Sequence, residues 1–60
     1  MNELKIKEKN CNITLFPVTE KEITYKHADV IWSDCMFIRF LTEDKQYKCF
    51  SGAYLIEKNQ

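Results

Sequence analysis

Residues 28–50 hold five of the eight aromatic residues of the chain, and polar residues interrupt this apolar stretch twice. The interruptions are Ser33 and Asp34 first, and residues 43–45 second. Aromatic and β-branched residues favour strands, and short polar breaks between strands are typical of hairpin turns. The pattern therefore predicts a three-stranded antiparallel meander, with the rest of the chain packed around it.

The first turn sets which side chains share a face of this meander. With Ser33 and Asp34 as a two-residue loop, Val30 pairs with Phe37 across the hairpin. Because side chains alternate between the two faces of a sheet, this register places Val30, Trp32 and Phe37 on one face.

The second turn allows two registers. A loop centred on residues 44–45 pairs Phe40 with Cys49. A loop that begins one residue earlier sets Arg39 opposite Lys48, and like charges directly opposite each other destabilise a sheet. We therefore expect the first of these registers.

The middle strand of the meander, residues 35–41, is apolar on both faces except at Arg39. A strand that is apolar on both faces needs cover on both faces. Sixty residues rarely provide two covering layers, so we expect a second copy of the chain or a partner to supply one of them. A homodimer is the oligomer predicted from this feature.

Further strands are predicted on both sides of the meander, and they cover residues 3–9, 13–16, 22–26 and 53–57. The first of them reads as an edge strand, because its alternating lysines discourage edge-to-edge aggregation. Asn10 and Asn12 predict a turn after it, since asparagine tolerates a positive φ. Gly52, the single glycine, predicts a turn or a bulge before the last strand.

Residues 19–32 fit two structures. Thr19 and Glu22 have the spacing of a helix capping box, with Val18 and Ile23 at the positions of a hydrophobic staple. The β-branched and aromatic residues of the segment favour two strands with a break near His27. We predict an all-β fold, a small antiparallel meander or partly closed barrel of five to six strands; the alternative is an α+β fold with one helix at about residues 20–31.

The length and the net charge of the chain argue against several classes of function. Sixty residues form one domain, residues 1–60, and nine basic residues balance nine acidic ones. A dedicated nucleic-acid binder usually shows a basic excess, which this chain lacks. We expect no signal peptide and no membrane segment, because no long apolar run is present. Three cysteines without a CxxC pair predict free thiols and a cytoplasmic location.

The residues offer little for catalysis. A single glycine excludes the glycine-rich phosphate loops. His27 with Cys49 as nucleophile and Asp29 as orienting group is a conceivable dyad, but Cys49 is more simply a small buried hydrophobe. The three cysteines and His27 have zinc-ligand chemistry without zinc-ligand spacing. We expect a protein without a cofactor or metal that is not an enzyme.

The aromatic residues are the strongest functional signal, eight in 60 residues, more than a domain of this size is expected to bury. Trp, Tyr and Arg dominate the energy of protein interfaces. We predict a non-catalytic module that binds a larger protein as an inhibitor or adaptor. By size and composition it is similar to phage and mobile-element accessory proteins, such as inhibitors of host enzymes or defence systems. The predicted contact residues are Trp32, Arg39, Tyr47, Tyr54, Asp34 and Asp44.

Two other functions fit the sequence. A small single-stranded nucleic-acid-binding protein would use exposed aromatic rings for stacking and lysines for the phosphates. Its candidate residues are Lys5, Lys7, Lys9 and Lys48. The other is a structural subunit of a homo-oligomer, which would have no separate ligand.

Overall fold

Five strands make up the structure, a computed structural model that describes residues 5–59. They are β1 (Glu8–Phe16), β2 (Ile23–Ser33), β3 (Phe37–Leu41), β4 (Tyr47–Ser51) and β5 (Ala53–Lys58). The all-β prediction is confirmed, with five strands. The alternative helix at about residues 20–31 is wrong, because most of that segment belongs to β2.

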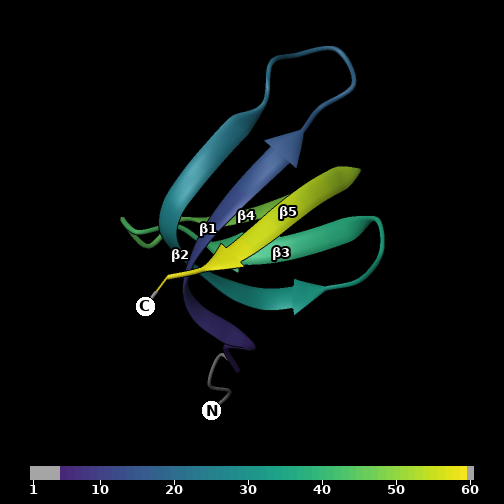
Figure 1. The fold of residues 1–60 in the computed structure, drawn as a ribbon. Helices are drawn as coiled ribbons and strands as arrows, with labels where there is room; N and C mark the ends of the chain where they lie inside the picture. The colour runs from purple at the N-terminus through teal and green to yellow at the C-terminus, as the bar shows by residue number, and fades with distance from the viewer. Residues whose placement is uncertain (1–4, 60) are drawn as a thin grey trace.

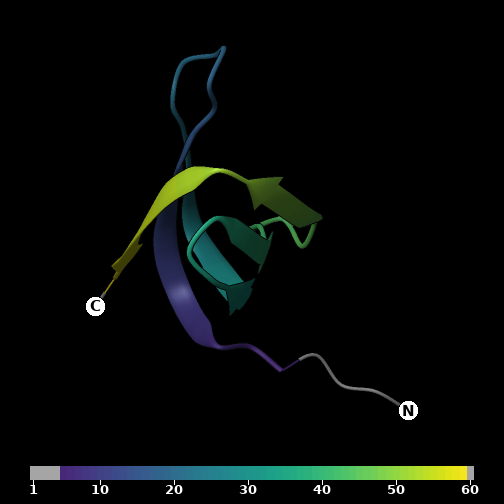
Figure 2. The same cartoon turned by 90° about the vertical axis from the view of Figure 1, so that its right-hand side faces the viewer.

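The strands form one antiparallel sheet in the order β4-β3-β2-β1-β5. The chain runs through β1 to β4 as a meander, and β5 then crosses back to pair with β1 (Figure 1). The sheet curls without closing into a barrel, so β4 and β5 are its two edges (Figure 2). The predicted edge strand over residues 3–9 is wrong: of its described residues only 8 and 9 are in a strand, β1, which lies between β2 and β5. Residues 3 and 4 of that prediction lie outside the described residues.

The predicted turn at Asn10 and Asn12 is a bulge inside β1. Asn10 has a positive φ of 57°, as asparagine tolerates, but the strand continues through it. His27 on β2 has a φ of 56°, and the β1–β2 register shifts on either side of Cys11. Because both strands kink at the same level, the ladder bends and the chain does not reverse. The predicted break near His27 is likewise a kink within one long strand.

The first hairpin turns two residues later than predicted. Asp34 donates its backbone N–H to the Phe37 carbonyl oxygen at 2.9 Å, so residues 35–36 form the loop. The Asp34 carboxylate accepts the backbone N–H of Met36 at 3.1 Å. Aspartate favours the first position of such turns because its side chain satisfies a nearby N–H, and here that preference sets the register.

The register change moves the β3 side chains to the opposite face from the one predicted. Val30 pairs with Phe40, and Ser33 pairs with Ile38. Ile38 and Phe40 are fully buried, whereas Phe37 is only half-buried. The predicted pairing of Val30 with Phe37 is therefore wrong.

The second hairpin has a three-residue loop, which lies between the two registers predicted for it. Phe40 pairs with Lys48, and Thr42 donates its N–H to the Gln46 carbonyl oxygen at 2.9 Å. Lys45 has a φ of 69°. A three-residue loop with a left-handed last residue is a common hairpin connection, and it was missed because the position holds lysine and not glycine.

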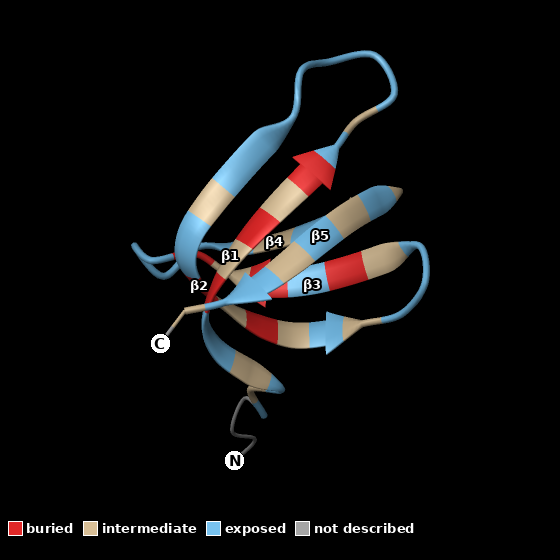
Figure 3. Cartoon of the chain, in the orientation of Figure 1, coloured by how far each residue is buried: buried red, intermediate tan, exposed pale blue. Residues whose placement is uncertain are grey.

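The core lies on the concave face of the curled sheet. Its buried residues run along the central strands, red in Figure 3, and they are Cys11, Ile13, Leu15, Ala28, Val30, Ile38 and Phe40. Phe50 from β4 and Tyr54 and Ile56 from β5 pack against this cluster, so both edge strands contribute to one core. The Phe40 ring meets the Tyr25 ring at a centroid distance of 5.1 Å.

Candidate functional site

The convex side of β2, β3 and β4, opposite the core, carries a row of exposed side chains that we call the outer face. Trp32 pairs with Arg39, and Arg39 pairs with Cys49, so the row crosses three strands. Tyr47 lies two residues before Cys49 and therefore on the same face. Trp32 is 54% exposed and Tyr47 is 56% exposed. Three of the predicted contact residues thus come together.

A bulge places Trp32 on this face. The β2–β3 register shifts between Val30, which pairs with Phe40, and Trp32, which pairs with Arg39. In a regular strand Trp32 would share the buried face of Val30, as the sequence pattern predicts. The extra residue in the bulge turns the indole outward, and bulges are over-represented where a side chain is re-aimed next to a functional site.

Arg39 gives the outer face a positive charge that no carboxylate of residues 5–59 neutralises. The Arg39 guanidinium carbon lies 5.8 Å from the centroid of the Phe37 ring, within the range of a cation–π contact. Within residues 5–59 the single ion pair joins Lys58 to Glu8 at 3.2 Å. Arg39 is therefore available to a carboxylate from outside the chain.

An open hollow lies beside this charge. It is lined by Arg39, Tyr47, Lys48 and Cys49. Lys48 lies between Tyr47 and Cys49 in β4, so the hollow follows this edge strand. A guanidinium, a phenol and a thiol suit an acidic or aromatic group. Phe37 and Cys49 were not among the predicted contacts, because their facing depends on the register.

Tyr54 and Asp34 lie together, away from the outer face. The Tyr54 ring packs against the core, and its hydroxyl donates to the Asp34 carbonyl oxygen. The Asp34 carboxylate accepts the backbone N–H of Met36, as described above. This geometry connects β5 to the β2–β3 turn and gives both residues a structural role.

Asp44 is exposed at the β3–β4 turn, where it accepts a hydrogen bond from the Thr42 hydroxyl. The Thr42 hydroxyl oxygen accepts the N–H of Gln46 at 2.9 Å. Thr42 is buried, so these bonds satisfy a hydroxyl that would be costly to bury alone. Asp44 contributes to the turn in this way.

The four candidate lysines do not form one stripe. Lys7 donates to the Ser33 hydroxyl at 3.0 Å and so joins the N-terminal segment to the end of β2. Lys5 and Lys9 are exposed beside it. Lys48 lies on β4, which β3 and β2 separate from β1. A strand of nucleic acid would have to cross the sheet to contact all of them.

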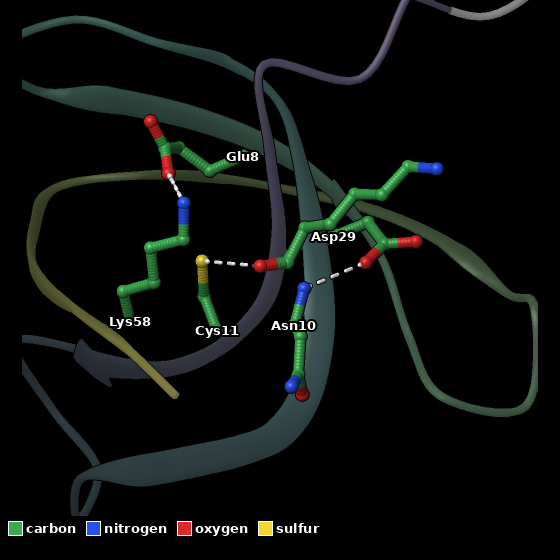
Figure 4. A network of polar contacts seen from close by, with 6 residues as sticks. Glu8, Asn10, Cys11, Asp29 and Lys58 are labelled. Atoms are coloured by element: carbon green, nitrogen blue, oxygen red, sulfur yellow. Dashed lines mark hydrogen bonds and ion pairs between the residues drawn. The ribbon is translucent and has the colours of Figure 1, made fainter. Parts of the chain in front are cut away.

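The conceivable dyad is not assembled. The His27 ring is hydrogen-bonded through Nδ1 to Asn10 Oδ1 at 2.8 Å. The Asp29 carboxylate accepts the Asn10 N–H at 3.0 Å (Figure 4). Both residues serve the bulge between β1 and β2, whereas Cys49 lies on the far side of β3. Cys35 lies in the β2–β3 turn and Cys11 in the core, so the ligand types for zinc are also dispersed.

A network of asparagines around the bulge was not predicted from the sequence. Asn59 donates its backbone N–H to the Asn10 carbonyl oxygen at 3.0 Å, and its side-chain amide donates to Asn12 Oδ1 at 3.0 Å. The two asparagines that flank Cys11 were the available signal. Asn10 and Asn12 hydrogen-bond polar groups that the kinked β1–β2 ladder leaves without a strand partner.

The three thiols are expected to differ in reactivity. Cys11 is fully buried, and burial, with a smaller effect of the Glu8 carboxylate, raises the pKa of its thiol. Cys35 and Cys49 are exposed. Because the thiolate is the reactive form, an aromatic disulfide reagent at neutral pH should titrate two thiols quickly and the third only in denaturant. Cys35→Ser and Cys49→Ser should each remove one fast thiol; equal rates for all three would contradict the burial of Cys11.

Comparisons of the chain with models of known protein families, with curated proteins and with solved structures return no match. Within residues 5–59 there is also no helix long and apolar enough to cross a membrane.

Proposed function

We propose that this chain is a small non-catalytic module that binds a larger protein through the outer face of β2, β3 and β4. The observation that carries this proposal is the outward placement of Trp32 beside Arg39. Binding would act by covering a surface of the partner, as an inhibitor or an adaptor does. The three free thiols support a reducing compartment such as the cytoplasm.

The energetic argument begins with the exposed indole. A buried tryptophan stabilises a small domain, whose core is limited by its size. The bulge before Trp32 instead leaves more than half of the side chain in water. Trp32, Tyr47 and Arg39 are the residue types that most often dominate an interface. Their adjacency supports a partner that covers all three.

Other exposed apolar residues form a weaker candidate surface. Phe16, Val18 and Ile23 surround the β1–β2 loop, which projects from the sheet in Figure 1. This group contains no tryptophan or arginine, and the adjacent loop carries Glu20 and Glu22. Acidic residues are depleted at interface cores, so the outer face is favoured.

The test is capture of a partner by tagged wild-type and Trp32→Ala proteins from lysates with and without nuclease treatment, read by mass spectrometry. We expect the wild type to retain one stoichiometric protein and Trp32→Ala to bind it roughly 30-fold more weakly, the effect of losing about 2 kcal/mol at an interface hot spot. Because the indole is more than half exposed, the variant should keep the thermal stability of the wild type.

Leu55→Ala is the matched control. Leu55 is 50% exposed on β5, at the other edge of the sheet, so its truncation should leave capture unchanged. Equal capture by wild type and Trp32→Ala would overturn the proposal. Binding that disappears with nuclease and weakens steeply with salt would instead establish the nucleic-acid function.

A further inference from the structure

The free side of β4 presents a regular row of backbone groups. A backbone hydrogen bond lies just beyond each end of β4. Thr42 donates its N–H to the Gln46 carbonyl oxygen at 2.9 Å, and Gly52 donates its N–H to the Met36 carbonyl oxygen at 2.8 Å. Both belong to the register that pairs Phe40 with Lys48. In an antiparallel ladder every second residue is bonded to the neighbouring strand.

This alternation determines which groups face outward. Lys48 and Phe50 direct their N–H and C=O groups to β3. Tyr47, Cys49 and Ser51 direct theirs to the other side, where no further strand of residues 5–59 lies. The connection at Gly52 leads β5 away to β1, so β5 does not take this place.

We propose that two copies of the chain pair through this edge, with β4 antiparallel to β4 of the second copy and a two-fold axis at Cys49. In this register Tyr47 lies opposite Ser51 of the second copy, and Lys48 lies opposite Phe50. All five residues of β4 are paired. The two edges are complementary because the row of outward groups is symmetric about Cys49.

Charge selects this register over its neighbour. An axis at Lys48 would set two ammonium groups directly opposite each other, which destabilises a ladder. With the axis at Cys49, the only charge of the strand meets the Phe50 ring of the second copy, a contact that an ammonium group and an aromatic face favour.

The other free edge is less suited to pairing. β5 carries Glu57 and Lys58, and charged residues are a common protection of edge strands. An antiparallel pair centred on Ile56 would set the half-exposed Leu55 opposite the Glu57 carboxylate of the second copy. Lys58 is also held in the ion pair with Glu8.

Pairing through β4 would complete the hollow beside Arg39. Three of the four residues that line the hollow belong to β4, the edge strand. The second copy would supply its missing wall through Ser51, next to Tyr47, and through its own Cys49. The two outer faces would then form one surface with two sets of exposed aromatic residues. This inference does not depend on the identity or existence of a larger partner.

Mass and hydrogen exchange test the pairing directly. Between micromolar and millimolar concentration, sedimentation should show the mass rising from 7.2 kDa to twice that value. The Cys49 amide should become protected over the same range, whereas the Lys48 and Phe50 amides should be protected throughout. A mass of one chain at millimolar concentration, or a Cys49 amide that exchanges fast at every concentration, would overturn the proposal.

Thiol cross-linking locates the axis without relying on a destabilised variant. Cys35→Ser leaves Cys49 as the exposed thiol, and a short bismaleimide should join two chains in high yield. Cys49→Ser leaves Cys35 and should give no cross-linked dimer. Cys49→Pro removes an N–H that β3 does not use, so it should yield a folded monomer. Cross-linking through Cys35, or a dimer that survives Cys49→Pro, would place the interface elsewhere and overturn the assignment.

Discussion

Replacing Phe40 by alanine is expected to leave the domain largely unfolded at room temperature. Phe40 is fully buried on β3, at the centre of the core, and its ring packs against Tyr25. Truncating a buried phenylalanine costs about 3–5 kcal/mol. Domains are stabilised by roughly 0.05–0.15 kcal/mol per residue, so about 3–9 kcal/mol is typical for this length. A 60-residue domain is marginal, so its stability lies at the low end of that range and the substitution removes most or all of it.

Urea unfolding followed by circular dichroism measures the effect, and Phe37→Ala is the matched control. Phe37 is the same residue type on the same strand, but it is half-buried on the outer face. Its truncation should cost about 1 kcal/mol, because a half-buried ring has less apolar area removed from water than the fully buried Phe40 ring. If Phe37→Ala destabilised the domain more than Phe40→Ala, the faces of β3 would be the reverse of those described.

The strands were predictable because their composition and polar breaks are local signals. Residues 33–34 and 43–45 interrupt the apolar pattern close to the two turns of the structure. The registers were not predictable in the same way. Asp34 acts through its side chain, and Lys45 adopts a left-handed conformation that its residue type does not announce. Neither hairpin carries an asparagine–glycine or aspartate–glycine signal.

Strand register determines which side chains come together in the candidate site. Trp32, Arg39 and Tyr47 were selected by residue type alone, and the structure brings them onto one face. Their adjacency depends on the bulge between Val30 and Trp32, which no residue of the segment specifies by itself. A shift of one residue moves every side chain of a strand to the other face. Sequence patterns therefore suggested the members of the site but not its geometry.

Three predicted contact residues have structural roles instead, and they are Tyr54, Asp34 and Asp44. Tyr54 has the amphipathic chemistry of an interface residue, and that chemistry serves equally well at the boundary of a core. Its ring lies on the core, and its hydroxyl satisfies a turn carbonyl. Only the packing of β5 across the curled sheet distinguishes these uses. Asp34 and Asp44 likewise belong to turns whose hydrogen bonds occupy their carboxylates.

Gly52→Ala is expected to destabilise the domain by about 2–4 kcal/mol, the cost of a side chain in a glycine-only backbone region plus displacement of a packed ring. Gly52 has a φ of 141° between β4 and β5. A Cβ atom there would lie 3.0 Å from Cε2 and 3.1 Å from Cζ of Phe50, whose ring packs on the core. The connection that sends β5 back to β1 thus depends on the absence of a side chain.

A double-mutant cycle with Phe50→Leu separates the two causes, because leucine lacks the ring atoms that the new methyl group would approach. The free energy of unfolding of all four proteins gives the coupling. The ring can shift while the backbone angle cannot, so we expect most of the cost of Gly52→Ala to persist in the Phe50→Leu background. Ser51→Ala, one residue earlier on the exposed side of β4, should change stability little. A neutral Gly52→Ala would mean that the β4–β5 connection relaxes to another conformation, and that β5 is not held against β1 by this turn.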